Sequence, residues 1–248
     1  MRLLRAELSK LVSLPSVWTA FAVGLLVPSV IAYLNASSMR GRNAQAAGLD
    51  VGFEELGFGV IAAIILGVVA VSSEYATEGE ESAGGRQITA SLTAAPSRGG
   101  FLLAKIGAVA LAAAVMSAVA TAATLGAVAF ALADAAPPMG EEVPRMLGVV
   151  VYWVLTALLA SAITLLTRNG IVPLAVLILN TSVVSVTFLL SKVTPLASYL
   201  PDMAGARMIT SRIHSSVEMP PVVGGLVMAA WVAALLAVGA AVFLRRDA

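Results

Sequence analysis

Six long apolar runs, almost free of charge, constrain this chain more than any other feature. A transmembrane helix needs ~20 apolar residues at ~1.5 Å each to cross ~30 Å of hydrocarbon. Charged residues make up only 12% of the chain, against roughly 25% in soluble proteins, and they lie in islands between the runs. The sequence therefore predicts an all-α integral membrane protein, a single transmembrane domain over residues 1–248. Its six predicted spans are 17–34, 56–73, 103–133, 146–167, 170–190 and 222–244.

The distribution of Lys and Arg predicts the orientation of these spans. With an even number of spans and a cytoplasmic N-terminus, nine of the 15 basic residues fall on the inner side. They concentrate at the two termini and at Arg168, between the fourth and fifth runs. Because cytoplasmic loops are enriched in Lys and Arg, we expect a multi-pass protein of the plasma membrane with both termini in the cytoplasm.

An amphipathic helix is predicted before the first span, over residues 1–16. Leucines at helical spacing share one face, and the charged residues lie mostly opposite. Glu7 falls at the edge of the apolar face, where lipid alone does not favour it. The helix therefore either contacts a partner or another part of the chain, or it anchors in the membrane interface. Its candidate residues are Arg5, Glu7, Leu8, Lys10 and Leu11.

The segment 74–100, between the second and third predicted spans, carries the densest charge in the chain. Glu74, Glu78 and Glu81 share one face of a helical extension of the second span, which Gly84 and Gly85 break. A short second helix is predicted from residue 86 to 95, before Pro96. This segment is either a lever that docks on a partner or a solvated loop. The remaining candidate contact residues are Arg86, Gln87, Ile88, Thr89, Ser91 and Leu92.

Two features near the end of the chain are less specific. The stretch 191–221 is rich in proline but also apolar, which predicts short helices at the outer surface, either as a gate or as a connector. The fifth predicted span contains a polar group that either lines a substrate path or bonds to nearby backbone. The candidate path residues are Asn180, Thr181 and Ser185.

Several function classes are excluded by what the sequence lacks. The chain has no cysteine and one histidine, so thiolate chemistry and histidine-rich metal sites are ruled out. None of its lysines follows a glycine, so it has no Walker A motif and we expect no ATP hydrolysis on this chain. No ionisable residue lies in the middle of a predicted span, which disfavours a pump or a secondary carrier. The sequence contains no basic patch with interleaved aromatic residues, so it does not predict nucleic-acid binding.

The stretch RAELSKLVSLPSVW before the first span resembles the start of permease subunits of ABC-2 type transporters. The stretch EYATEGEESAGGRQITASLTAAPSRGGFLLAK resembles the cytoplasmic coupling segment of that family. The letters YLP in the last long loop and the closing FLRRDA are similar to bacterial, especially actinobacterial, members. The order of these motifs and the six predicted spans carry the resemblance over the whole chain.

The resemblance implies a permease that dimerises, as a homodimer or a heterodimer, in membrane lipid above two copies of a separate ABC ATPase. ATP and magnesium would bind the ATPase, and no cofactor would bind this chain. The N-terminal helix then corresponds to an interface helix, residues 86–95 to a coupling helix, and 191–221 to external helices. The substrate would pass near the second and fifth spans. An amphiphilic or hydrophobic cargo, such as an antibiotic, a peptide or a lipid-like molecule, would be exported.

Two other functions stay open from the sequence. One is a membrane sensor or scaffold subunit that uses the same segments for protein contacts. The other is a secondary carrier, which the missing ionisable groups disfavour.

Overall fold

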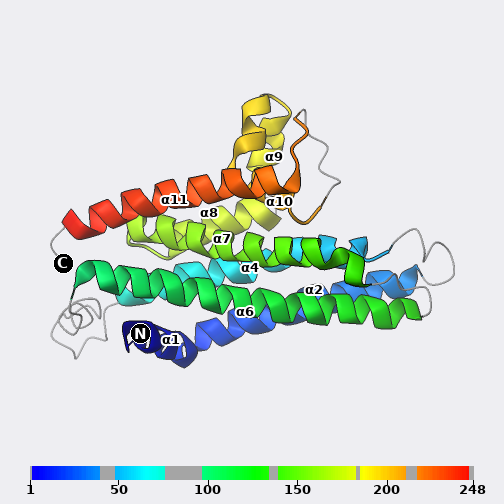
Figure 1. Ribbon diagram of the computed structural model, residues 1–248, viewed down its shortest axis with the longest axis horizontal. Helices are drawn as coiled ribbons and strands as arrows, with labels where there is room; N and C mark the ends of the chain where they lie inside the picture. Colours follow the sequence, from blue (N-terminus) through cyan, green and yellow to red (C-terminus); the bar gives the residue numbers. More distant parts are fainter. Residues whose placement is uncertain are drawn as a thin grey trace.

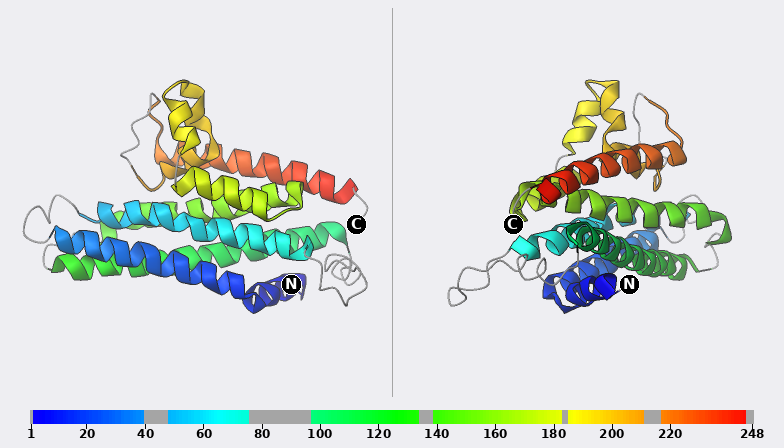
Figure 2. Two further views of the ribbon diagram at one scale, coloured as in Figure 1. Left: turned by 180° about the vertical axis from the view of Figure 1, so that it is seen from behind. Right: turned by 60° about the vertical axis from the view of Figure 1, so that its left-hand side comes forward.

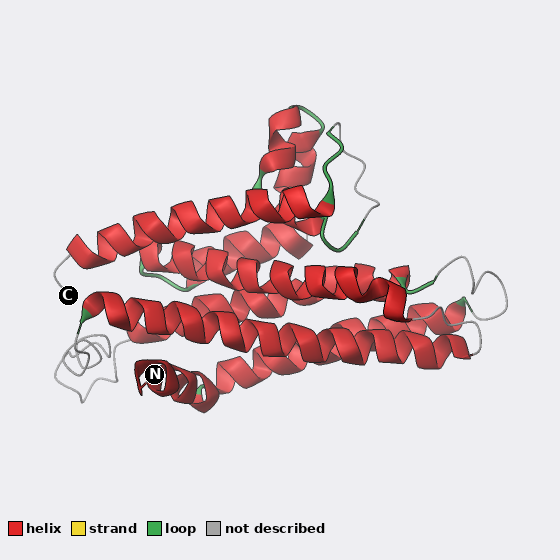
Figure 3. Cartoon of the chain, viewed as in Figure 1, coloured by secondary structure: helices red, strands yellow, loops and turns green. Residues whose placement is uncertain are grey.

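The computed structural model describes residues 2–39, 48–75, 97–133, 139–182, 185–210 and 217–245. Within these ranges the chain forms helices and no strands (Figure 3). The predicted coupling helix at 86–95 lies outside the described residues. So do most of its candidate contacts: Glu78, Glu81, Arg86, Gln87, Ile88, Thr89, Ser91 and Leu92.

Five of the described helices are long and apolar enough to cross a membrane. Each begins slightly before the span predicted for it, because the helix continues into polar residues beyond the apolar run. They run side by side along the long axis of the molecule, and both chain ends lie at the same end of this bundle (Figures 1 and 2). The five are α2 (Pro15–Ser38), α4 (Asp50–Ser72), α6 (Arg98–Leu132), α7 (Val143–Thr167) and α11 (Pro221–Arg245).

The predicted N-terminal helix is a separate element, α1 (Arg2–Ser13), packed on α6. Leu14 between α1 and α2 has an extended backbone, with φ −83° and ψ 119°. The ring of Pro15 disfavours helical geometry in the residue before it, and it suits the first turn of a new helix. The Leu-Pro pair therefore ends one helix and starts the next, so α1 can turn back against the bundle.

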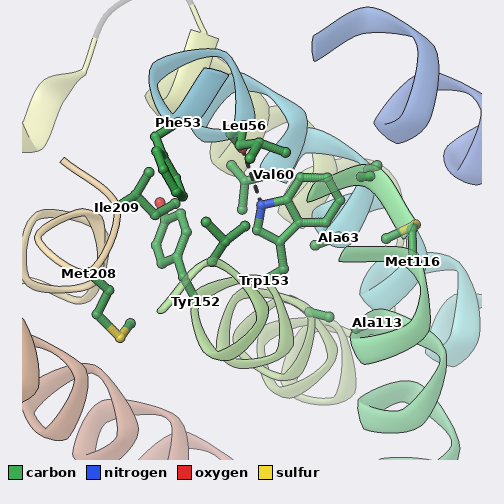
Figure 4. Close-up of a cluster of buried hydrophobic side chains, with 14 of the residues drawn as sticks. Phe53, Leu56, Val60, Ala63, Ala113, Met116, Tyr152, Trp153, Met208 and Ile209 are labelled. Carbon is green, nitrogen blue, oxygen red and sulfur yellow. Dashed lines mark hydrogen bonds between the residues drawn. The ribbon is translucent and has the colours of Figure 1, made fainter. Parts of the chain in front are cut away.

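Helices α4 and α7 form the centre of the bundle. Their most apolar windows are each 61% buried, against 22% for α2 and α11. The two central helices approach closely at Gly67, where an added Cβ would lie 2.1 Å from the Ala157 carbonyl oxygen. Small residues allow such contacts between membrane helices. Trp153 of α7 is fully buried against α4 and donates its indole N–H to the Leu56 carbonyl at 3.2 Å (Figure 4).

The fifth predicted span, 170–190, is not one continuous helix, and this boundary was wrong. The chain forms α8 (Ile171–Ser182) and then α9 (Val186–Ser191), which leaves the direction of the bundle (Figure 1). The 12 residues of α8 extend only about 18 Å, less than the ~30 Å of a bilayer core. A new helix starts after Ser185, whose side chain accepts a hydrogen bond from the Phe188 amide. Hydropathy does not detect such a cap, so it did not predict the break.

Short helices occupy the remaining described segments. In the stretch predicted to hold short helices, prolines begin a 3-10 turn, η4 (Pro195–Tyr199), and α10 (Pro201–Ala206), which packs on α11. Two further 3-10 turns, η1 (Ser73–Tyr75) and η3 (Met139–Glu142), extend the end of α4 and precede α7. These short elements matter for the sites below, because η1 and α10 each position an acidic side chain.

Candidate functional site

Four charged side chains meet at the end of the bundle that holds both termini. We call them the ion cluster: Glu7 and Lys10 from α1, Glu74 from η1, and Lys105 from the second turn of α6. Glu7 and Glu74 are two of the candidate residues from the sequence, and Lys10 is a third. Of the two alternatives left open for α1, the structure supports a contact with another part of the chain.

Lys105 lies at the centre of the ion cluster. Its Nζ donates to Glu7 Oε2 at 2.6 Å, to Glu74 Oε1 at 3.0 Å and to the Ala70 carbonyl at 3.2 Å. An ammonium group has three N–H donors, so these contacts use all of them. The ring of Phe101, one turn earlier in α6, has its centroid 5.2 Å from the same Nζ, within cation–π range. One side chain thus ties α1, α4 and η1 to α6.

Lys10 completes the ion cluster at its more exposed edge. Its Nζ lies 3.1 Å from Glu74 Oε1 and 3.2 Å from a Glu7 oxygen. Partial burial lowers the pKa of Lys10, but hydrogen bonds to the two carboxylates and their charges outweigh that effect and raise it. Lys10 therefore stays charged at neutral pH, and the cluster pairs two acidic side chains with two basic ones.

Burial makes this cluster different from an ordinary surface ion pair. Glu7, Glu74 and Lys105 are only 4%, 3% and 7% exposed. Buried ions lose hydration, and their mutual attraction compensates this loss only when the geometry is good and the hydrogen bonds are complete. Removing one partner leaves a charge buried without compensation, which typically costs about 3–5 kcal/mol. The cluster therefore makes α1 an integral part of the bundle.

The ion cluster lies on both flanks of the segment 76–96. Glu74 belongs to η1, which ends at Tyr75, and α6 begins at Arg98. Ser97 caps α6 by accepting a hydrogen bond from the Gly100 amide at 3.1 Å. The Arg168 guanidinium lies 5.7 Å from the centroid of the Tyr75 ring and so adds a contact to the end of α7. Where the chain enters and leaves this segment, it is therefore held to α1 and to the bundle.

A second site, here called the side cavity, lies beside the first turns of α4. Its volume is about 420 Å³. Glu54 and Phe58 line it from α4, Tyr152 from α7, and Asp202 and Met203 from α10. Glu54 of the cavity and Glu74 of the ion cluster are 20 residues apart along α4 and η1, which corresponds to about 30 Å. The two sites therefore lie at opposite ends of the same central helix.

The three candidate path residues all line the side cavity. Asn180 donates from its amide nitrogen to Asp202 Oδ2 at 2.8 Å, and the Thr187 hydroxyl donates to the same oxygen. Thr181 donates instead to the Leu177 carbonyl at 2.8 Å, within its own helix. The backbone-bonding alternative therefore holds for Thr181, and a role of the three residues in a substrate path stays a prediction.

The remaining candidate residues of α1 separate into two groups. Leu11 is buried and Leu8 is half-buried against the core, whereas Arg5 is exposed. The neighbouring Val12, four residues after Leu8 and therefore on the face that the leucines were predicted to share, is 60% exposed. The buried face is instead centred on Glu7, because its pairing with Lys105 turns that side of α1 inward.

Sequence reasoning did not assign Lys105 or Asp202 a role in a site. One sequence feature could have pointed to Lys105. It directly precedes a long uncharged run, and the N-terminal helix contains an acid, Glu7, for which a basic partner was not identified. No such feature pointed to Asp202, because its neighbours Asn180 and Thr187 come from helices that hydropathy merged into one. Only the fold brings Asp202 beside them.

A comparison with known protein families identifies the family of this chain. The sequence matches the family described as ABC-2 family transporter protein over residues 3–185 of its 248. The matched region contains the whole ion cluster and the three candidate path residues. No curated protein matches the chain. Members of this family are transport components that are not themselves catalytic, and membership implies an ABC ATPase as partner. The chain therefore belongs to the ABC-2 transporter family, as a multi-pass membrane subunit of an ABC transporter.

Proposed function

We propose that this chain is the permease subunit of an ABC exporter for an amphiphilic or hydrophobic substrate, such as an antibiotic, a peptide or a lipid-like molecule. Two copies of a separate ABC ATPase bind ATP and magnesium and drive it from the cytoplasm. The permease acts as a dimer in the plasma membrane, with both termini cytoplasmic, which agrees with the Lys and Arg distribution.

The ion cluster is the observation that carries this proposal. A partner can move the membrane helices only if the segment that it contacts is firmly connected to them. Glu74 and Lys105 lie on the two sides of segment 76–96 and contact each other at 3.0 Å. Both also contact α1, through Lys10 and Glu7. A displacement of this segment is therefore transmitted to α4, α6 and α1 together.

Within this proposal the acidic residues of the segment have different roles. Glu74 is buried among its own chain's lysines, so it transmits force and does not face the ATPase. Contact with the ATPase is assigned to the helix predicted at 86–95, with Ile88 and Leu92 on its docking face.

Exposed apolar surface supports the remaining parts of the proposal. Helices α2 and α11 present large apolar side chains outward, among them Leu26, Leu34 and Leu226, which are 57%, 59% and 65% exposed. Such surfaces fit contact with lipid or with a second permease subunit.

Copurification tests the proposed partner. A tagged chain, extracted from its native membrane in gentle detergent, should bring down a nucleotide-binding protein, and transport in vesicles should require ATP. Failure to recover any ATPase would refute the permease assignment and favour a sensor or scaffold subunit.

A paired substitution tests the docking face. Leu92→Glu places a charge on the predicted apolar face and should detach the ATPase while the chain still inserts. The matched control, Ala90→Glu, adds the same charge on the opposite face of the same predicted helix. It should retain the ATPase. If both variants behave alike, or if Leu92→Glu keeps normal transport, the predicted docking face is wrong.

A further inference from the structure

We infer that the side cavity binds ligands that join an apolar body to a cationic amine, with Asp202 as the anion that recognises the amine. The inference deepens the proposed function, on which it rests for calling such a ligand a transported substrate. Binding itself is a property of this chain alone.

The side cavity has the size and lining of a small-molecule site. Its volume of about 420 Å³ falls within the roughly 300–1,000 Å³ that is usual for ligand pockets. Phe58, Tyr152 and Met203 supply apolar and aromatic surface from three different helices. Such a lining accommodates the apolar body of an amphiphile, while the few polar groups orient it.

The charge of the lining has one sign. Glu54 and Asp202 line the cavity, and no lysine or arginine is among the described residues that do so. The guanidinium of Arg145 lies close by, 4.1 Å from the centroid of the Phe53 ring, but it pairs with Asp50 and donates to the Ile209 carbonyl. An acidic, partly aromatic cavity favours a cation over an anion or a neutral ligand.

Asp202 is the carboxylate best placed to make this distinction. Its Oδ2 accepts hydrogen bonds from Asn180 and Thr187, which join α8 and α9 to α10. Its Oδ1 is buried and has no hydrogen-bond partner among the residues that the structure describes. A buried acceptor without a donor destabilises a protein, and the cost is larger when the acceptor is charged. Joining the helices requires only Oδ2, so a structural role leaves Oδ1 without a donor. Asp202 also lines the cavity, where its negative charge attracts an ammonium group.

Two fluorescent probes separate charge from shape. Monodansylcadaverine carries a primary ammonium group on an apolar fluorophore, and its N-acetyl derivative is neutral with nearly the same shape. Their fluorescence is titrated with the full-length chain in lipid nanodiscs, and empty nanodiscs correct for partition into lipid. We expect the amine to bind the chain at least about tenfold more tightly than the acetylated probe, as a paired buried charge implies.

Substitutions then locate the anion. Asp202→Asn keeps an oxygen that can accept from Asn180 and Thr187, but it removes the charge. It should weaken binding of the amine about tenfold or more and leave the acetylated probe unchanged. Glu218→Gln, at an exposed acid outside the cavity, should change neither. Equal binding of both probes by the unaltered chain, or unchanged amine binding by Asp202→Asn, would overturn the inference.

A second variant covers the case in which Asp202→Asn does not fold. Phe58 is 51% exposed and lines the cavity, so Phe58→Leu should fold and remove only the ring face. Its ring lies in the apolar lining for the body that both probes share, so Phe58→Leu should weaken both several-fold. Unchanged binding of both probes would refute the assignment of the ligand to this cavity. No ATPase is present in these titrations, so their failure leaves the permease proposal standing. A failed copurification would in turn leave measured binding intact.

Discussion

Replacing Lys105 by Met tests whether the ion cluster holds α1 to the bundle. Methionine keeps an unbranched apolar side chain of similar length, so the main change is the loss of the ammonium and its three hydrogen bonds. Glu7 and Glu74 then share one cation of the cluster, Lys10, and both stay buried at 4% and 3% exposure.

The expected cost follows from leaving buried charge uncompensated. Breaking a buried pair from one side destabilises a protein by about 3–5 kcal/mol. For a chain of about 150–250 residues, 1 kcal/mol shifts Tm by about 2–4 °C. Lys105→Met should therefore lower Tm by about 6–20 °C, as measured by intrinsic tryptophan fluorescence in a mild detergent.

Two further variants show whether the charge is responsible. Lys192→Met removes an exposed lysine outside the cluster and should shift Tm by no more than about 1–2 °C. The triple variant Glu7→Gln, Glu74→Gln, Lys105→Met removes the stranded charges too, so it should be more stable than Lys105→Met alone. A Lys105→Met variant as stable as Lys192→Met, or a triple variant less stable than the single one, would refute this account of the cluster.

Two further predictions concern single contacts in the helices. Gly67→Ala should lower Tm by several degrees, because its Cβ would lie 2.1 Å from the Ala157 carbonyl oxygen. The control Gly126→Ala, whose Cβ would have no neighbour within 4 Å, should be neutral or stabilising. A lower Tm for Gly126→Ala than for Gly67→Ala would contradict this packing. Ser97→Ala should lower the free energy of unfolding by about 1 kcal/mol, because it removes the cap on the Gly100 amide. Amide hydrogen exchange should become faster in the first turn of α6 alone. Unchanged protection of that turn would argue against the cap.

The outline of the fold was accessible from the sequence because lipid imposes a simple rule. Backbone groups in hydrocarbon must bond within a helix, so a long uncharged run predicts a span without knowledge of its neighbours. Five of the six predicted runs coincide with helices long enough to cross a membrane. The amphipathic pattern also predicted the separate N-terminal helix, and the structure ends it at Ser13, before Pro15, because that proline restricts Leu14.

The same rule failed where polar contacts decide the structure. Residues 170–190 are apolar enough for one span, but Asp202 accepts hydrogen bonds from Asn180 and Thr187 on either side of the break. Hydropathy averages over a window and cannot register a hydrogen bond to a residue 22 positions away. The side cavity depends on this break, so its acidic residue could not be found from the sequence.

The sequence by itself determined that the chain resides in a membrane, that α1 stands apart from the first span, and that Glu7 lies where lipid alone does not favour it. Only the tertiary structure decided which residue pairs with Glu7. Lys105 is 98 residues away in the sequence, and no periodicity connects positions so far apart. Their pairing follows from the packing of α1 on α6, which buries both charges together, because neither could be buried alone without a large loss of hydration energy.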